Sequence, residues 1–165
     1  DSLFKNNPHL MITKVCLDLS NTFKPNTQYE SLPKVVINAK EQRQNILSIR
    51  SLKLPNHKII PNVGSFFKNP VISESKLNEL VIKFPNIKSY LFKKNRYKVS
   101  AAWLIEEAGL KGSKKGDCGI SDLHSLVFYN FSDQSDFLVT YSLEVKDIIE
   151  EKFGIILDYE PSIFS

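Results

Sequence analysis

The chain has 165 residues, of which 42% are hydrophobic and 24% are charged, and its formal net charge at pH 7 is +4. This length suffices for one globular domain or two small lobes and argues against a large multidomain enzyme. The apolar runs fall far short of the roughly 20 residues that span a bilayer, which argues against a membrane protein.

The charge is distributed unevenly along the chain. Residues 1–115 carry 20 of the 22 Lys and Arg residues but only 8 of the 18 acidic residues, a net charge of +12, whereas residues 116–165 have a net charge of −8. Such a separation favours nucleic acid or an anionic small ligand as a partner of the basic part. Two solvated faces that attract each other across the fold would produce the same pattern.

The cysteines and histidines predict no metal site. Cys16 and Cys118 lie far apart and neither belongs to a Cys-x-x-Cys pair. His9, His57 and His124 lack the spacing of metal ligands. We therefore expect a reduced, cytoplasmic protein.

The first expected elements are a strand and a helix. Residues 11–19 alternate apolar and polar side chains, the period of a half-buried strand. A loop with Pro and Asn follows at 23–33. Residues 39–52 then place apolar side chains near helical spacing before Pro55, which predicts a connecting helix.

The remainder of the chain mixes helices and strands without a regular β-α-β repeat. The expected elements are a helix between its cap Ser73 and Pro85, a helix at 101–108 between Ser100 and Gly109, a strand at 125–131, a helix from Ser135 to Phe153 and a strand at 155–159. This order predicts an α+β fold, with a mixed or antiparallel sheet and packed helices.

Two segments have the composition of ligand sites. The four glycines of residues 109–119 fit neither dinucleotide nor phosphate-loop spacing, so a flexible connector is favoured there. Residues 83–98 interleave six basic residues with four aromatic ones. That composition suits single-stranded nucleic acid, but no RNA-binding motif accompanies it, and an anionic sugar nucleotide would use the same residues.

The most specific segment is Asn62-Val-Gly-Ser-Phe-Phe-Lys-Asn-Pro70. Ser65 follows a glycine, so a turn could present its hydroxyl, while the two Phe residues would exclude water. The chain has no G-x-S-x-G elbow, so an acyl-transfer triad is not supported. An ordinary Gly-Ser turn beside a Phe-Phe core pair is the structural alternative.

Four sequence blocks together resemble UDP-N-acetylenolpyruvoylglucosamine reductase, also called UDP-N-acetylmuramate dehydrogenase. They are Lys53-Leu-Pro55, Gly64-Ser-Phe-Phe-Lys-Asn-Pro70, Ala101-Ala-Trp-Leu-Ile-Glu106 and Leu110-Lys-Gly112. The resemblance runs in order from residue 2 to residue 160. It implies FAD bound by an N-terminal half, NADPH as the reductant of the flavin, and a UDP-sugar whose enolpyruvyl group is reduced during peptidoglycan precursor synthesis.

The resemblance also implies roles for seven residues. Ser65 would donate a proton to the carbanion-like intermediate, and Glu160 would stabilise the developing enolate or assist its protonation. The positions matched to substrate binding are Tyr29, Lys53, Asn69, Tyr90 and Lys98.

The chain departs from the family pattern at several positions. The family's catalytic arginine belongs to a Tyr-Arg pair that would immediately precede Asp1, and nearly all of the FAD-binding half lies outside these 165 residues. Ser121 and His124 replace the family's histidine and glutamine, and Pro161-Ser-Ile-Phe164, which includes Ile163, stands in place of the usual arginine. These departures bear on substrate orientation and on the contact with the flavin.

The resemblance predicts four segments. Residues 1–38 would be the C-terminal remnant of the FAD-binding domain, 39–50 a connector helix, 51–155 the UDP-sugar domain, and 156–165 a C-terminal strand that carries Glu160. We expect the isolated chain to be inactive. A non-catalytic module that binds a UDP-sugar or nucleic acid, and one half of a split enzyme whose N-terminal FAD-binding half is encoded separately, remain alternatives.

Overall fold

The computed structural model describes residues 3–4, 7, 9–26, 32, 35 and 37–163. The chain forms two compact units, Asp1–Ile46 and Leu47–Ser165. The helix α1 (Ala39–Lys53) contains the boundary between them. Among the described residues, no helix is both long and apolar enough to cross a bilayer.

The strand predicted at 11–19 is wrong, because these residues form no strand. Met11, Leu17 and Leu19 are 84%, 75% and 77% exposed. An alternating pattern produces a strand only where another strand supplies hydrogen-bonding partners, and no described segment of the first unit does so. The apolar side of the pattern consequently lies in solvent.

The first unit contains the start of α1, which is fixed by local hydrogen bonds. The Asn38 side chain accepts the N–H of Glu41 at 2.9 Å, and the Glu41 carboxylate accepts the N–H of Ile37 at 2.8 Å. This reciprocal exchange resembles a capping box. The predicted helix is therefore confirmed, although α1 buries none of its side chains.

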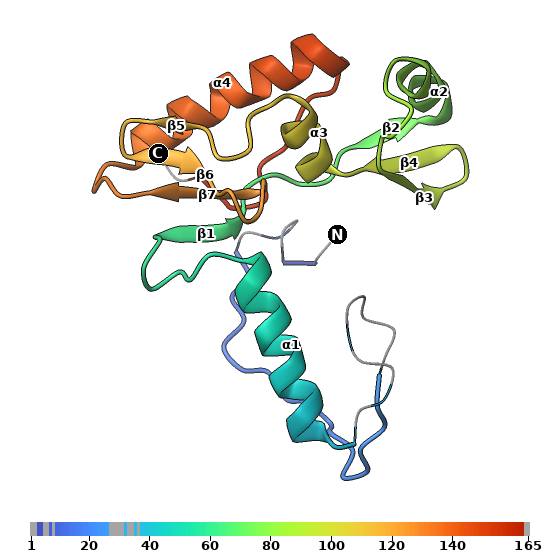
Figure 1. Cartoon of the computed structure of the whole chain (residues 1–165), viewed down its shortest axis with the longest axis vertical. Coiled ribbons are helices and arrows are strands. Elements are labelled where there is room, and N and C mark those ends of the chain that lie inside the picture. The colour runs from blue at the N-terminus through green and yellow to red at the C-terminus, as the bar shows by residue number, and fades with distance from the viewer. Residues whose placement is uncertain are drawn as a thin grey trace. The chain divides into compact units, whose positions relative to one another are not determined.

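The second unit contains two antiparallel sheets (Figure 1). The four-stranded sheet has the order β1 (Asn62–Ser65), β7 (Val127–Asn130), β6 (Cys118–Ile120) and β5 (Lys114–Lys115), and the three-stranded sheet has the order β2 (Val71–Ser73), β4 (Arg96–Val99) and β3 (Ser89–Lys93). The predicted α+β class is confirmed, and both sheets are antiparallel. The strand expected at 125–131 is β7.

The three helices predicted in this unit are present. The Ser73 hydroxyl caps α2 (Glu74–Lys83) by accepting the N–H of Lys76 at 3.2 Å. Ser100 caps α3 (Ala101–Glu107) in the same way, through the N–H of Trp103 at 3.2 Å. The helix α4 (Ser135–Phe153) ends at Gly154, whose φ of 63° lies in the left-handed region.

The strand predicted at 155–159 is wrong, and of the segment predicted as a strand at 156–165 the described residues 156–163 form none. Ile155 and Leu157 are buried in alternation, as the pattern indicates, but only Tyr159 forms a β-bridge, with Phe67. A single bridge is too short to be a strand. The alternation therefore reports burial of one side of this segment rather than continuous pairing.

The helices pack on the sheets around a common core. The helix α4 contacts β6 and β7, while α2 contacts β2 and β4 on the other sheet (Figure 1). The core joins side chains from both sheets and from α3 and α4, including Phe67, Val99, Leu104, Phe128 and Ile149. Both sheets are thus held by one apolar cluster, which fixes the loops and edges that carry the candidate site.

Candidate functional site

The Gly-Ser turn presents Ser65 at the edge of the four-stranded sheet. The Asn62 side chain accepts the N–H of Gly64 at 3.0 Å and donates to the carbonyl of Ile60 at 2.7 Å. Gly64 has a φ of +81°, a conformation that L side chains rarely adopt, and the β1–β7 register shifts at this point. Ser65 then pairs with Val127 and is exposed.

The two phenylalanines after Ser65 anchor this segment in the core. The Phe66 ring stacks on Phe128 with centroids 4.9 Å apart, and the Phe67 ring meets Phe128 edge to face at 5.3 Å. Both Phe side chains are almost fully buried. The serine is therefore carried on rigid backbone although its own side chain faces outward.

The C-terminal segment pairs with the residues that follow Ser65. The N–H of Lys68 donates to the carbonyl of Asp158 at 2.8 Å, and the N–H of Glu160 donates to the carbonyl of Phe66 at 3.0 Å. These two bonds flank the bridge between Phe67 and Tyr159. The backbone of Glu160 therefore lies beside the residue next to Ser65, which brings the two candidate catalytic residues into one region.

Tyr159 fastens this C-terminal segment to the core. Its ring stacks on Phe67 with centroids 5.4 Å apart, and Lys146 Nζ lies 4.8 Å from its ring centroid. Its hydroxyl lies 2.9 Å from the hydroxyl of the fully buried Ser142 on α4. The residue before Glu160 is consequently held on three sides.

Asn69, Tyr90 and Lys98 form a second cluster. The Asn69 side chain accepts the N–H of Ala101 at 2.9 Å, at the start of α3, and donates to the Tyr90 hydroxyl at 3.1 Å. Tyr90 on β3 stands directly opposite Lys98 on β4. The fold thus unites three of the five positions matched to substrate binding.

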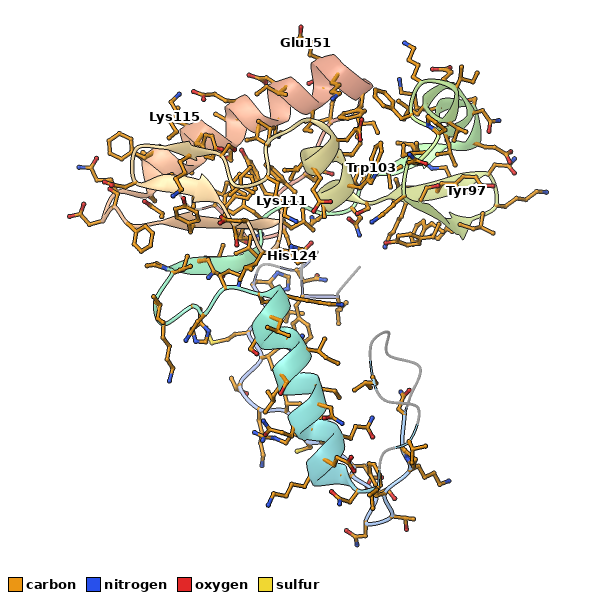
Figure 2. All side chains as sticks on the ribbon, viewed as in Figure 1. Tyr97, Trp103, Lys111, Lys115, His124 and Glu151 are labelled. Carbon is orange, nitrogen blue, oxygen red and sulfur yellow. The ribbon has the colours of Figure 1, made fainter. Side chains whose placement is uncertain are left out.

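Tyr90 and Lys98 occupy the face of the three-stranded sheet that α2 does not cover. Successive side chains of a strand point to opposite faces, and Tyr97 (Figure 2), next to Lys98, donates to Glu74 of α2 at 3.3 Å. Lys98 therefore points away from α2. Cross-strand partners share a face, so Tyr90 does the same.

A turn between β6 and β7 lies next to the Ser65 segment, because the N–H of Phe66 donates to the carbonyl of Leu126 at 2.8 Å. It contains two of the departures from the family pattern, Ser121 and His124. The Ser121 hydroxyl accepts the N–H of Leu123 at 3.2 Å, and His124 Nδ1 accepts the N–H of Leu126 at 3.2 Å. Both replacements therefore serve as turn-forming acceptors in this chain.

The same turn contains a partly buried hydrogen bond that the sequence did not indicate. Ser125 donates to the Glu106 carboxylate at 2.7 Å. The Nζ of Lys111, which Figure 2 labels, lies 3.2 Å from the same oxygen. The pKa of Glu106 is lowered, chiefly by the Ser125 hydrogen bond and further by Lys111, against the opposing effect of burial. Burial, above all, lowers the pKa of His124.

Two expected residues are not joined to these clusters. Tyr29 lies outside the described residues. Lys53 is the exposed last residue of α1, and none of the contacts among the described residues links it to Ser65 or Asn69. The described part of the chain also has no group of three or more residues that could hold a metal ion.

The described residues lack the features of a Rossmann-type dinucleotide site. Their sheets are antiparallel throughout, and no glycine-rich turn leads from a strand into a helix N-terminus, where the diphosphate of a dinucleotide binds.

Fold and site together define an antiparallel α+β domain with an exposed serine at the edge of one sheet, a glutamate paired with the segment that follows it, and a tyrosine and a lysine on the open face of the other sheet. The family model described as "UDP-N-acetylenolpyruvoylglucosamine reductase, C-terminal domain" matches residues 54–164. The chain belongs to this family, which confirms the resemblance carried by the sequence motifs.

Curated relatives extend the match over almost the whole chain. The UDP-N-acetylenolpyruvoylglucosamine reductase of Shewanella sediminis is 37% identical over 93% of this chain and 46% of its own length. Those of Idiomarina loihiensis and Flavobacterium johnsoniae are 35% and 34% identical over 97% and 99% of this chain, and over 49% and 52% of their own lengths. The chain thus spans about half the length of the curated relatives it matches.

Proposed function

We propose that the chain is the substrate-binding half of a UDP-N-acetylenolpyruvoylglucosamine reductase, which reduces the enolpyruvyl group of its UDP-sugar to give UDP-N-acetylmuramate for peptidoglycan synthesis. The observation that carries the proposal is the pairing of 158–160 with the Ser65 segment through the Glu160 N–H and the Phe66 carbonyl, 3.0 Å apart. This pairing supports the proposal because it brings the backbone of Glu160 beside the residue next to Ser65, and the family motifs match both residues to chemistry.

Ser65 is the proposed proton donor to carbon. A serine hydroxyl is a weak acid, but it can protonate a strongly basic carbanion that lies within hydrogen-bond reach. The exposed side chain at the rigid edge of β1 suits this role, because the backbone on both sides is fixed while the hydroxyl stays accessible. Glu160 is proposed to stabilise the enolate or to assist its protonation.

The cluster of Asn69, Tyr90 and Lys98 is proposed to bind the UDP group. An ammonium and hydroxyl or amide donors are suitable partners for diphosphate oxygens. Asn69 has a second role in this scheme, because its amide already holds the Tyr90 hydroxyl at 3.1 Å and so sets the orientation of the phenol. Lys53 and Tyr29 are proposed as further contacts to the same ligand.

FAD and NADPH belong to the proposed whole enzyme. The family resemblance assigns the flavin to an N-terminal half, and NADPH supplies its reducing equivalents. Because the resemblance assigns the flavin to that half, we propose that the 165-residue chain alone does not oxidise NADPH. The partner half, whether part of the same polypeptide or encoded separately, would work beside this domain in the cytoplasm.

A titration of the chain with UDP tests the binding role. We expect Lys98→Ala to weaken UDP binding about fivefold or more, since a charge-assisted contact to a phosphate is lost. Lys94→Ala, on the same hairpin, is the matched control. Equal UDP affinity of both variants and of the unaltered chain contradicts the assignment of Lys98. If the chain does not bind UDP but binds single-stranded nucleic acid with a steep salt dependence, the proposal is wrong and the chain is a nucleic-acid-binding module.

A further inference from the structure

Two lysine ammonium groups lie near one aromatic ring, Phe92, on the face of the three-stranded sheet that α2 does not cover. Phe92 lies two residues after Tyr90 on β3 and is 42% exposed. Lys98 Nζ is 4.5 Å from its ring centroid, and Lys93 Nζ is 5.2 Å from the same centroid. Both distances are within the range in which a cation is attracted to the face of an aromatic ring.

The strand register explains how both lysines reach the ring. The β3–β4 pairing is regular from Ser89 to Leu91 and shifts before Lys93, which pairs with Arg96. A regular strand would point Lys93 and Phe92 to opposite faces, whereas an irregularity redirects the side chains next to it. Lys93 is therefore free to turn back over the ring of its own neighbour, while Lys98 approaches from β4.

Within the described part of the chain, no carboxylate neutralises the two ammonium groups. Among the described residues, neither Lys93 nor Lys98 forms an ion pair with a carboxylate. The nearest strand partner of Lys93 is another cation, Arg96. Two like charges held near one ring repel each other, so this arrangement is favoured by an anion that can accept from both.

We propose that Phe92 is a positioning residue that holds Lys98 and Lys93 as a paired-ammonium site for the diphosphate of a nucleoside diphosphate. The ligand class rests on the proposed function. Phe92 acts through the lysines, whereas Lys93 is a second phosphate contact that the family motifs do not indicate. The Tyr90 phenol, on the same strand face, lies beside this site.

The geometry can be tested without any ligand. An aromatic ring shifts the NMR signals of protons that lie over its face, so the ε-methylene protons of Lys98 and Lys93 will resonate upfield of those of Lys94. Phe92→Leu will move both signals to the Lys94 position, and Phe92→Tyr will keep them shifted. Leu91→Ala changes an exposed apolar side chain on the same strand and will leave both signals in place. Unshifted signals in the unaltered chain overturn the proposal.

UDP and uridine then test the ligand. We expect Phe92→Leu and Lys93→Gln each to weaken UDP binding about two- to fivefold, with uridine affinity unchanged by Lys93→Gln. Lys94→Gln is the control and will match the unaltered chain, while Phe92→Tyr will restore affinity. If the unaltered chain binds UDP and both variants bind it equally well, this inference is wrong and the proposed function stands. Failure of the unaltered chain to bind UDP overturns both.

Discussion

At the scale of single residues, the hydrogen bond between Ser125 and Glu106 has a measurable electrostatic effect. The bond stabilises the charged carboxylate and is the largest cause of the lowered Glu106 pKa. Ser125→Ala is therefore expected to raise the pKa of Glu106 toward its ordinary value, as measured by an NMR titration of the side-chain carboxyl. Ser121→Ala, in the same turn, is the control. An unchanged Glu106 pKa in Ser125→Ala contradicts this assignment.

The lowered pKa of His124 predicts that the free energy of unfolding depends on pH. Burial lowers its pKa in the folded state, so the unfolded chain binds the proton more readily and folding loses stability as the pH falls below the ordinary value of about 6.5. Protonation at Nδ1 would also remove the acceptor for the Leu126 N–H. We expect His124→Gln to reduce the loss of unfolding free energy between about pH 7 and 5.5. Replacement of the exposed His57 by Gln is the control, and equal slopes for both variants contradict the prediction.

At the scale of an element, the hydroxyl of Tyr159 is expected to stabilise the C-terminal segment against the core. Tyr159→Phe keeps the stacking on Phe67 but removes the bond to the Ser142 hydroxyl, so it is expected to cost about 1 kcal/mol of unfolding free energy. Amide exchange of the Glu160 N–H, which bonds to Phe66, should become faster. The control Tyr97→Phe loses only an exposed bond to Glu74. Unchanged stability and unchanged exchange in Tyr159→Phe count against this role.

Local signals explain which elements the sequence predicts correctly. Ser73 and Ser100 each accept an N–H three residues later, and Gly154 ends α4 in the left-handed region, so the helix limits depend on neighbouring residues alone. Strands depend on partners that are distant in sequence, and for this reason the strands predicted at 11–19 and 155–159 are wrong. The sequence of the β3–β4 hairpin indicates a basic, aromatic segment but predicts no strands there. The sequence signal for its turn is Asn95, a residue type that tolerates the left-handed backbone conformation, and its φ is 57°.

The site was predictable in its parts but not in its assembly. The Gly-Ser-Phe-Phe-Lys-Asn-Pro block and Glu160 were assigned from motifs, yet their pairing requires the bridge between Phe67 and Tyr159, which no local pattern encodes. The role of Phe92 follows from its i, i+2 relation to Tyr90, once 89–93 is known to be a strand. The Ser125–Glu106 bond joins a turn to a helix, and the sequence offers no signal for it.

At the scale of the whole molecule, the exposed apolar side chains of residues 11–19 agree with the proposal that a further half packs on this region. Met11, Leu17 and Leu19 are more than 70% exposed, an unusual arrangement for neighbouring apolar residues. We expect addition of an N-terminal half from a full-length relative to protect the amides of 11–19 from hydrogen exchange. It should also confer NADPH oxidation that depends on the UDP-sugar. If the added N-terminal half neither protects the amides of 11–19 nor confers NADPH oxidation, the proposed partner half is contradicted.

The central claim is that one UDP-sugar site joins the Ser65 turn, the Glu160 segment and the open face of the three-stranded sheet. An amide NMR titration of the chain with the enolpyruvyl UDP-sugar tests it most directly. The claim predicts saturable shifts at Ser65, Asn69, Tyr90, Lys98 and Glu160, with Lys114 on β5 unmoved. Absence of saturable shifts, or shifts that avoid these residues and gather elsewhere, would contradict it.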